Sequence, residues 1–367
     1  MKGELSMKIL LKDRMFSEKE QLFIDNGELK AYIFRYDSGV CAVKLVNSKG
    51  YITVLPYQGQ MVWDAVFGGR SLTMQNDCKE PKFRPHFRDT YGCYVMHCGI
   101  LRMGCPSEQD DHAHHGELPY VTYDKASIVT GTDEKGEYIA VTGTYEYYKV
   151  FDNHYEARPM TKLYAGSTLI DIILEIENKA SAPMDLMYQC HINNATEVGA
   201  KVYQTLPWDD EHMIARTSIP QYSDVDPRFV DLLGRVQEDV SATRVIGEDD
   251  VYDPEIVMFL RNPVKDANGH VHYVYQHTDG TADYTTYDAN ILDHGVRWMV
   301  HHADWHAMGM VLPGTAEPEG YTAELAKGNV RKLPGKQTWR SLITAGYLTK
   351  DEAEEKIAMI KDIMGEE

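Results

Sequence analysis

The chain has 367 residues, 43% of them hydrophobic and 25% charged, which is enough to build a large buried core. Its formal net charge of -19 at pH 7 argues against nucleic acid and anionic membranes as partners, because both attract clustered Lys and Arg. The start MKGELSMKILLKD has no apolar leader, and nowhere do about 18 apolar residues run together, so we expect a cytoplasmic protein.

Alternation of apolar and polar residues with a period of two dominates the chain. In LIDIILEIEN, residues 169–178, Ile170, Ile172 and Leu174 face one way while Asp171 and Glu175 face the other. Similar runs, rich in Val, Ile, Tyr and Thr and bounded by turn formers, occupy residues 31–39, 41–50, 50–59, 138–151 and 270–280. This pattern predicts strands of antiparallel sheets with one buried face.

Few segments have the period of a helix. The strongest is residues 349–364, where an apolar stripe follows Thr349, a residue suited to cap the helix start, and the stripe consists of Ala353, Ile357, Ile360 and Met364. A second candidate is SEKEQLF, residues 17–23. No linker divides the chain, so we predict one all-β domain over residues 1–367. It is a large antiparallel β-sandwich with its core at about 30–348 and a C-terminal helix at about 350–364.

Cysteine and histidine usage bears on metal binding. The six cysteines have no CxxC spacing, which predicts reduced thiols rather than a disulfide framework or a zinc site. The run DDHAHHGELPY, residues 110–120, could grip a metal, move protons on a substrate or form a solvated loop. A metal held by His112, His114 and a distant partner such as His191 stays open. Three near-adjacent histidines rarely all reach one ion, however, so we predict no metal and no cofactor.

Four stretches concentrate polar groups that could do chemistry. Residues 55–74 present Trp63, Asp64 and Arg70 after a strand, and residues 96–120 end in the histidine run. In DLMYQCHINNA, His191 and Asn193 lie on one side of a strand at a two-residue offset. The last stretch, residues 295–324, holds several histidines, two tryptophans and several glutamates.

Taken in chain order, these motifs resemble the aldose 1-epimerase (galactose mutarotase-like) superfamily, and more narrowly an uncharacterised branch of mutarotase-related proteins. The resemblance extends over about residues 50–348, through the HG of His115, the HxN of His191 and the LPGK at 333–336. It implies an antiparallel β-sandwich that binds a sugar in an open cleft and interconverts its α and β anomers without a cofactor. In such chemistry an acid protonates the ring oxygen while a base takes the proton of the anomeric hydroxyl.

The resemblance also implies roles for particular residues. His191 matches the general acid, and His115 matches the histidine that hydrogen-bonds the ring oxygen or a neighbouring hydroxyl. Arg70 matches a substrate-gripping arginine, and Trp298 an aromatic residue of the related branch. The remaining residues expected to contact the substrate are Glu117, Asn193 and His302.

One position departs from the family pattern. The catalytic glutamate expected late in the chain falls on Leu312, and leucine cannot accept a proton. The base is then supplied by Glu317 or Glu319, or by a histidine of HHADWH (His301, His302 or His306), or the protein does not perform simple mutarotation.

Three classes of function therefore stay open. The first, which we predict, is an isomerase of the aldose 1-epimerase type acting on a free sugar, as a monomer or homodimer. The second is other acid–base sugar chemistry on the same scaffold, such as isomerisation or elimination, with or without a metal. The third is a non-catalytic carbohydrate-binding protein.

Overall fold

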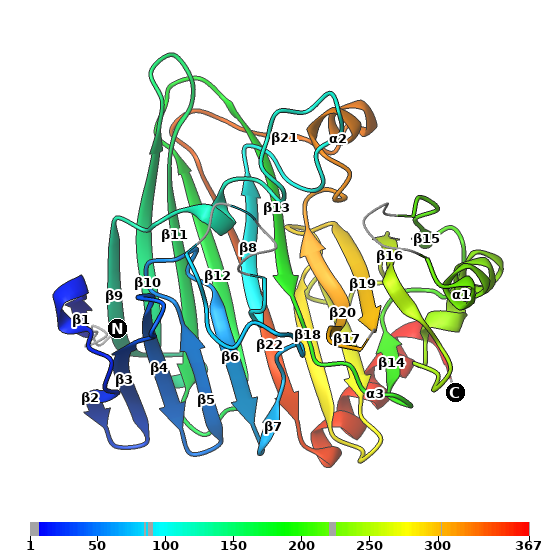
Figure 1. The fold of residues 1–367 in the computed structure, drawn as a ribbon, viewed down its shortest axis with the longest axis horizontal. Helices are drawn as coiled ribbons and strands as arrows, with labels where there is room; N and C mark the ends of the chain where they lie inside the picture. The colour runs from blue at the N-terminus through cyan, green and yellow to red at the C-terminus, as the bar shows by residue number, and fades with distance from the viewer. Residues whose placement is uncertain (1–6, 84–85, 87–90, 220–224, 302, 367) are drawn as a thin grey trace.

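Two large antiparallel sheets face each other in the computed structural model, which describes residues 7–83, 86, 91–219, 225–301 and 303–366 (Figure 1). Within these residues, one sheet has nine strands and the other thirteen. All pairings between neighbouring strands are antiparallel, for example Ile172 with Ile343 in the smaller sheet. The predicted all-β sandwich is thus confirmed.

The nine-stranded sheet carries the longest strands. Its spatial order is β1 (Met7–Leu10), β9 (Lys125–Asp133), β10 (Gly136–Tyr148), β11 (His154–Tyr164), β12 (Leu169–Asn178), β22 (Thr338–Leu348), β18 (Ala282–Asp288), β17 (His270–Gln276) and β14 (Lys201–Gln204).

The thirteen-stranded sheet carries the histidines of interest. Its main path is β15 (Met213–Ala215), β16 (Tyr252–Arg261), β19 (His294–His301), β20 (His306–Gly314), β13 (Met184–Ile192), β8 (Val95–Ile100), β6 (Val62–Phe67), β5 (Gly50–Val54), β4 (Cys41–Asn47), β3 (Leu29–Arg35) and β2 (Gln21–Asn26). Two short strands complete it, β21 (Arg331–Leu333) beside β13 and β7 (Arg70–Ser71) beside β6.

The two faces of the thirteen-stranded sheet have different partners. On β13, Leu186, Tyr188 and Cys190 belong to the main core between the sheets. The alternate residue Met187 belongs to a second cluster with Cys98 and Ala316, which lies on the outer face. Because side chains alternate along a strand, His191 also points to this outer face, which is covered by the long connections after β8 and β20.

Helices are few within the described residues. They are α1 (Pro227–Glu238), α2 (Tyr321–Lys327) and α3 (Lys350–Met364), together with the short 3₁₀ helices η1 (Asp13–Met15), η3 (Leu118–Tyr120) and η4 (Val240–Thr243). Helix α3 begins after Thr349 as predicted, and it buries Ala353 and Ile360. The predicted helix at residues 17–23 is wrong, since this segment bends and then enters β2 at Gln21. No helix in the described parts of the chain is long and apolar enough to cross a membrane.

Candidate active site

The histidine of the HxN motif is held in one orientation. His191 is 4% exposed, and its Nδ1 lies 2.7 Å from Oδ1 of Asn193. Asn193 donates its amide to the carbonyl of Cys93, so its Oδ1 can only accept. Nδ1 of His191 therefore carries the proton in the neutral ring, and Nε2 is left as the proton acceptor. The hydroxyl of Tyr91 also reaches this pair and donates to Asn193 at 3.2 Å.

His115 is placed by a tight loop that crosses β8. Its N–H donates to the carbonyl of Gly104 at 2.8 Å, and its carbonyl accepts from the N–H of Gly99 at 2.9 Å. Its φ of 61° is in the left-handed region, as is that of Gly116 at 80°. A Cβ on Gly116 would lie 2.1 Å from the carbonyl oxygen of Arg102, so only glycine fits here. The HG pair thus fixes where the histidine points.

The two predicted histidines lie together. The ring centres of His115 and His191 are 5.4 Å apart, and that of His114 is 4.6 Å from His115. His114 also places Nε2 at 3.5 Å from Sγ of Cys105. We call His114, His115 and His191 the histidine cluster.

Burial keeps the two inner histidines uncharged. Loss of solvation lowers the pKa of His191 to about 4; the hydrogen bond to Asn193 opposes this change, and the nearby His114 adds to it. The pKa of His115 is also held well below its usual value, first by burial and then by its histidine neighbours His114, His191 and His112. At neutral pH both rings are therefore neutral, and His191 is poised to accept a proton rather than to donate one.

An aromatic and ionic wall lies beside His191. The ring of Trp298 is 5.3 Å from that of His191, and its Nε1 donates to Glu255 at 2.7 Å. The second oxygen of Glu255 accepts from Arg216 at 2.5 Å. Sequence reasoning missed Glu255, Arg216 and Tyr91. Glu255 precedes Val257 by two residues, so the alternation of β16 placed it on the face of Trp298, but only the strand pairing identifies which face that is.

Leu312 lies beside His191, in an apolar cluster of the thirteen-stranded sheet. Gly314 pairs with Gln189, so the antiparallel register brings Leu312 beside His191. Its side chain is 1% exposed and packs with Val257, Phe259 and Val296, with Trp298 at the edge. The surface next to His191 is therefore apolar at this position.

Glu317 and Glu319 flank Pro318, which bonds to Cys105, a residue that also contacts His114 of the histidine cluster. Cys105 donates its N–H to the carbonyl of Pro318, between the two glutamates. Burial raises the pKa of the Cys105 thiol to about 11, and the charges of Glu255 and Glu319 add to this while Arg216 opposes it. The charges of Glu255 and Glu319 are therefore both felt at the Cys105 thiol. No contact joins either glutamate to a histidine of the cluster among the interactions of the described residues.

Lys327 gathers three carboxylates. Its Nζ lies 2.6 Å from Glu317 and 2.8 Å from Glu324, and it also pairs with Glu319. Arg261 reaches Glu317 at 2.5 Å. Burial alone would raise the pKa of Glu317, but the hydrogen bonds from Arg261 and Lys327 outweigh it and hold the pKa below its usual value. In the described parts of the chain, these glutamates are the one group of three ligand-type side chains close enough to share an ion, and the ammonium of Lys327 already pairs with all three.

The structure does not bring Arg70 to the histidine cluster. Its guanidinium pairs with Glu197 at 2.7 Å and with Asp279 at 3.0 Å. Arg70 also sits beside Phe67, at the far end of β6 from Val62, the residue that pairs with β8.

The other predicted contacts differ in their surroundings. Glu117 accepts from the N–H of Leu101 and the hydroxyl of Tyr155, so its carboxylate supports the loop. The rings of His301 and His306 face each other at 4.4 Å across β19 and β20. His302 lies outside the described residues.

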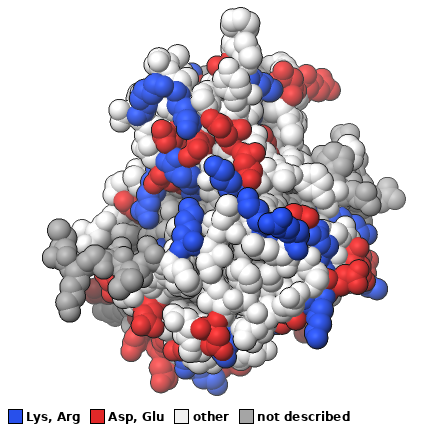
Figure 2. All heavy atoms as spheres, turned by 90° about the vertical axis from the view of Figure 1, so that its left-hand side faces the viewer, with Lys and Arg blue, Asp and Glu red and all other residues white. Residues whose placement is uncertain are grey.

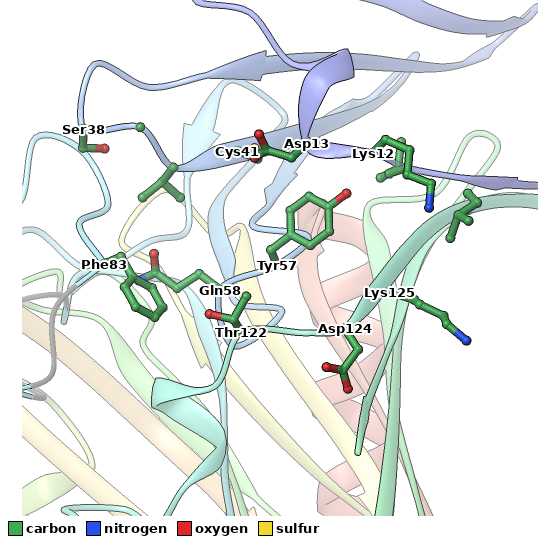
Figure 3. A pocket seen from close by; sticks show the side chains of 14 residues that line it. Lys12, Asp13, Ser38, Cys41, Tyr57, Gln58, Phe83, Thr122, Asp124 and Lys125 are labelled. Carbon is green, nitrogen blue, oxygen red and sulfur yellow. Dashed lines mark hydrogen bonds between the residues drawn. The ribbon is translucent and has the colours of Figure 1, made fainter. Parts of the chain in front are cut away.

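A separate cavity of about 490 Å³ lies near the N-terminal edge of the sheets (Figure 3). Tyr57, Gln58 and Thr122 surround it, and Lys12 and Asp13 close one side. Its lining contains no histidine, so it lacks the proton-transfer groups found in the histidine cluster.

Comparison with solved structures shows which fold this is. A candidate aldose 1-epimerase from Klebsiella pneumoniae aligns with a TM-score of 0.79 at 14% identity, covering 99% of this chain and 96% of that one. A galactose mutarotase-like protein from Clostridium acetobutylicum aligns with a TM-score of 0.60 at 13% identity, over 88% and 99% of the two chains. A galactose 1-epimerase from Lactobacillus acidophilus gives 0.50 at 11%, over 90% and 98%.

Comparison of the sequence alone identifies one family. No curated protein matches the chain. The profile of a family described as Domain of unknown function (DUF4432) matches residues 37–346, most of the molecule. The chain has the fold of galactose mutarotase-like proteins, and it belongs to the DUF4432 family.

Proposed function

We propose that the protein is an acid–base isomerase of the aldose 1-epimerase type, acting on a free sugar at the histidine cluster. One observation carries the proposal: His191 is held in a single tautomer by Asn193, with the ring of His115 5.4 Å away. A buried histidine needed only for packing has no reason to be paired in this way with a second neutral histidine. The fold shared with mutarotase-like proteins gives further support.

The neutral state of His191 determines the order of proton transfers. Its Nε2 takes the proton of the anomeric hydroxyl while the bond from the anomeric carbon to the ring oxygen breaks, and the carbonyl forms. The imidazolium then returns this proton to the former ring oxygen, giving the open aldehyde. Rotation of the aldehyde and the reverse steps produce the other anomer. His115 orients the sugar by hydrogen bonding to the ring oxygen or a neighbouring hydroxyl.

The role of a carboxylate is a separate question. If Glu317 or Glu319 is the relocated base, His191 returns to the role of the acid that the family resemblance implies. Glu317 is ionised at neutral pH because Arg261 and Lys327 stabilise its charge, and the same two cations make it a weak proton acceptor. Among the described residues, Glu317 and Glu319 bond to Arg261 and Lys327 and not to the histidine cluster, and this favours the histidine as the group that moves the proton.

Polarimetry on glucose, galactose and several rarer aldoses tests the proposal. We expect His191→Gln to slow anomerisation by about 10²–10⁴-fold, the usual effect of losing a positioned acid–base group. His97→Gln is a matched control, because His97 is equally buried on the opposite face of β8, bonded to Tyr188. Glu317→Gln and Glu319→Gln distinguish a relocated base from a histidine acting without one.

A parent protein that fails to exceed the buffer rate on every sugar would contradict the proposal. Sugar binding without turnover would then identify a carbohydrate-binding protein, a reading that the apolar Leu312 beside His191 favours.

A further inference from the structure

Gln189 is a buried amide without a hydrogen-bond partner. It lies on β13, is 1% exposed, and neither its Oε1 nor its Nε2 makes a hydrogen bond to any described residue. An amide in this state loses its bonds to water and gains none in return, which is unfavourable. Such a group in a folded protein requires an explanation.

Two other buried amides of the described residues, Asn178 and Gln204, are paired, whereas Asn194 donates its amide N–H but leaves its Oδ1 without a partner. Asn178 donates to the carbonyls of Ala182 and Leu333. Gln204 donates to the carbonyl of Leu206 and accepts from Arg297. Gln189 differs from these amides because both its oxygen and its nitrogen lack a hydrogen-bond partner among the described residues.

The position of Gln189 connects it to the histidine cluster. It precedes His191 by two residues, so both side chains leave β13 on the outer face of the sheet. Its neighbour Tyr188 pairs with Gly99, whose N–H holds the carbonyl of His115. The loop that carries His115 therefore crosses the sheet next to Gln189, and Gln189 itself pairs with Cys98, a member of the apolar cluster of Met187.

We propose that the side-chain amide of Gln189 binds one hydroxyl of the sugar and helps to select it. This inference rests on the proposed function. A sugar hydroxyl both donates and accepts, and an amide that lacks both partners matches it; an apolar group or a carboxylate would not. The selected substrate class is a sugar with a free hydroxyl at the position that meets Gln189, and its deoxy analogue is rejected.

The test compares Gln189→Met with Gln204→Met, which removes a paired amide of the same size. Thermal unfolding and the affinity for D-galactose, D-glucose and the monodeoxy analogues of the sugar that binds are measured for both variants and the parent. We expect Gln204→Met to lower the melting temperature and Gln189→Met to leave it unchanged or raise it. We also expect Gln189→Met to weaken sugar binding about tenfold, as loss of one or two neutral hydrogen bonds would.

The deoxy analogues make the result independent of folding. One analogue should bind the parent about tenfold more weakly than its sugar, and Gln189→Met should bind the two equally. Equal discrimination by parent and variant overturns the inference while the proposed function stands. A melting temperature lowered as in Gln204→Met, with sugar binding intact, identifies a structural amide and also overturns it. A parent that binds no sugar overturns both the inference and the proposed function.

Discussion

Asn193 determines both the orientation and the protonation state of His191. Its oxygen accepts from Nδ1, because its amide is committed to the carbonyl of Cys93. A neutral partner gives the imidazolium form little support, so burial prevails and the pKa of His191 lies at about 4. The residue beside the histidine therefore sets when it can accept a proton.

Replacing Asn193 with Asp should raise the pKa of His191 by about one to three units, because an adjacent carboxylate stabilises the imidazolium. Histidine NMR titration measures the change directly. In the rate of anomerisation, the acid limb of the parent should fall near pH 4, where His191 gains its proton, and it should move upward in the variant. An acid limb that stays in place would show that another group moves the proton.

Leu312 should behave as a core residue. Leu312→Ala leaves a cavity among Val257, Phe259 and Val296 and should lower the free energy of unfolding by about 2–5 kcal/mol. Leu312→Glu buries a carboxylate among these apolar side chains and should lower it at least as much, although it restores the carboxylate that the family pattern expects. Urea denaturation measures both, and a Leu312→Glu protein as stable as the parent would mean that this position is open to water.

At the residue scale, the sequence predicted the part of the site that motifs carry. His115, His191 and Trp298 meet in one place, and Asn193 orients His191. Glu255 could not be predicted, because nothing local marks one glutamate of an alternating strand as the partner of a tryptophan 43 positions away. The partners of Arg70 could not be predicted either, because tertiary structure brings Glu197 and Asp279 to it.

Strands and the last helix could be read from the period of their side chains. The predicted run at 169–178 is β12 itself, and the predicted start of the C-terminal helix is confirmed. Helix α1 was missed, although Asp226 caps it, Pro227 begins it and Phe229, Leu232, Leu233 and Val236 form its buried stripe. The segment at 17–23 has helix-forming residues but no stripe to bury, so the neighbouring strand β3 recruits Gln21 and Leu22 instead.

Helix α3 should depend on its first turn. The hydroxyl of Thr349 and the carboxylate of Glu352 form a capping box. Thr349→Ala should therefore lower the free energy of unfolding by about 0.5–2 kcal/mol. Glu354→Gln, an exposed change one turn in, is the control and should have little effect. Equal effects of the two variants in urea denaturation would show that the cap contributes nothing.

The whole molecule is acidic, but its surface charges are mixed. On the face shown in Figure 2, Lys and Arg lie among Asp and Glu rather than in a patch of their own. Arg158, for example, contacts Glu156 on its own strand β11 and both Glu175 and Glu177 on the neighbouring strand β12. Buried histidines differ from these surface groups, because burial lowers their pKa and keeps them uncharged at neutral pH.

Acid should destabilise the fold before most carboxylates gain protons. Burial lowers the pKa of His97 and of His191 to about 4, and it also holds the pKa of His115 well below its usual value. The unfolded chain binds these protons near pH 6.5 and the folded one does not, so stability is complete above that pH and falls as the pH drops toward 4. Each histidine contributes a slope of at most about 1.4 kcal/mol per pH unit.

Denaturation in urea at several pH values measures this slope. His97→Gln should reduce it by the contribution of one histidine, while leaving the dependence above pH 7 unchanged. A slope that is the same in both proteins would show that His97 takes up its proton without unfolding.

The loop of the histidine run, residues 110–120, is hydrogen-bonded to the start of α2, which follows it by about 200 residues in the sequence. Asp110 accepts from the N–H and hydroxyl of Thr322, His112 accepts from the N–H of Tyr321, and the loop and α2 lie side by side at the upper end of Figure 1. During synthesis, more than 200 residues are therefore added after His115 before its loop can form these hydrogen bonds to Tyr321 and Thr322. A nascent chain halted before Tyr321 would carry both histidines and much of the sheet without the clamp that holds their loop. The loop of the histidine run can thus be anchored only after Tyr321 and Thr322 have been synthesised.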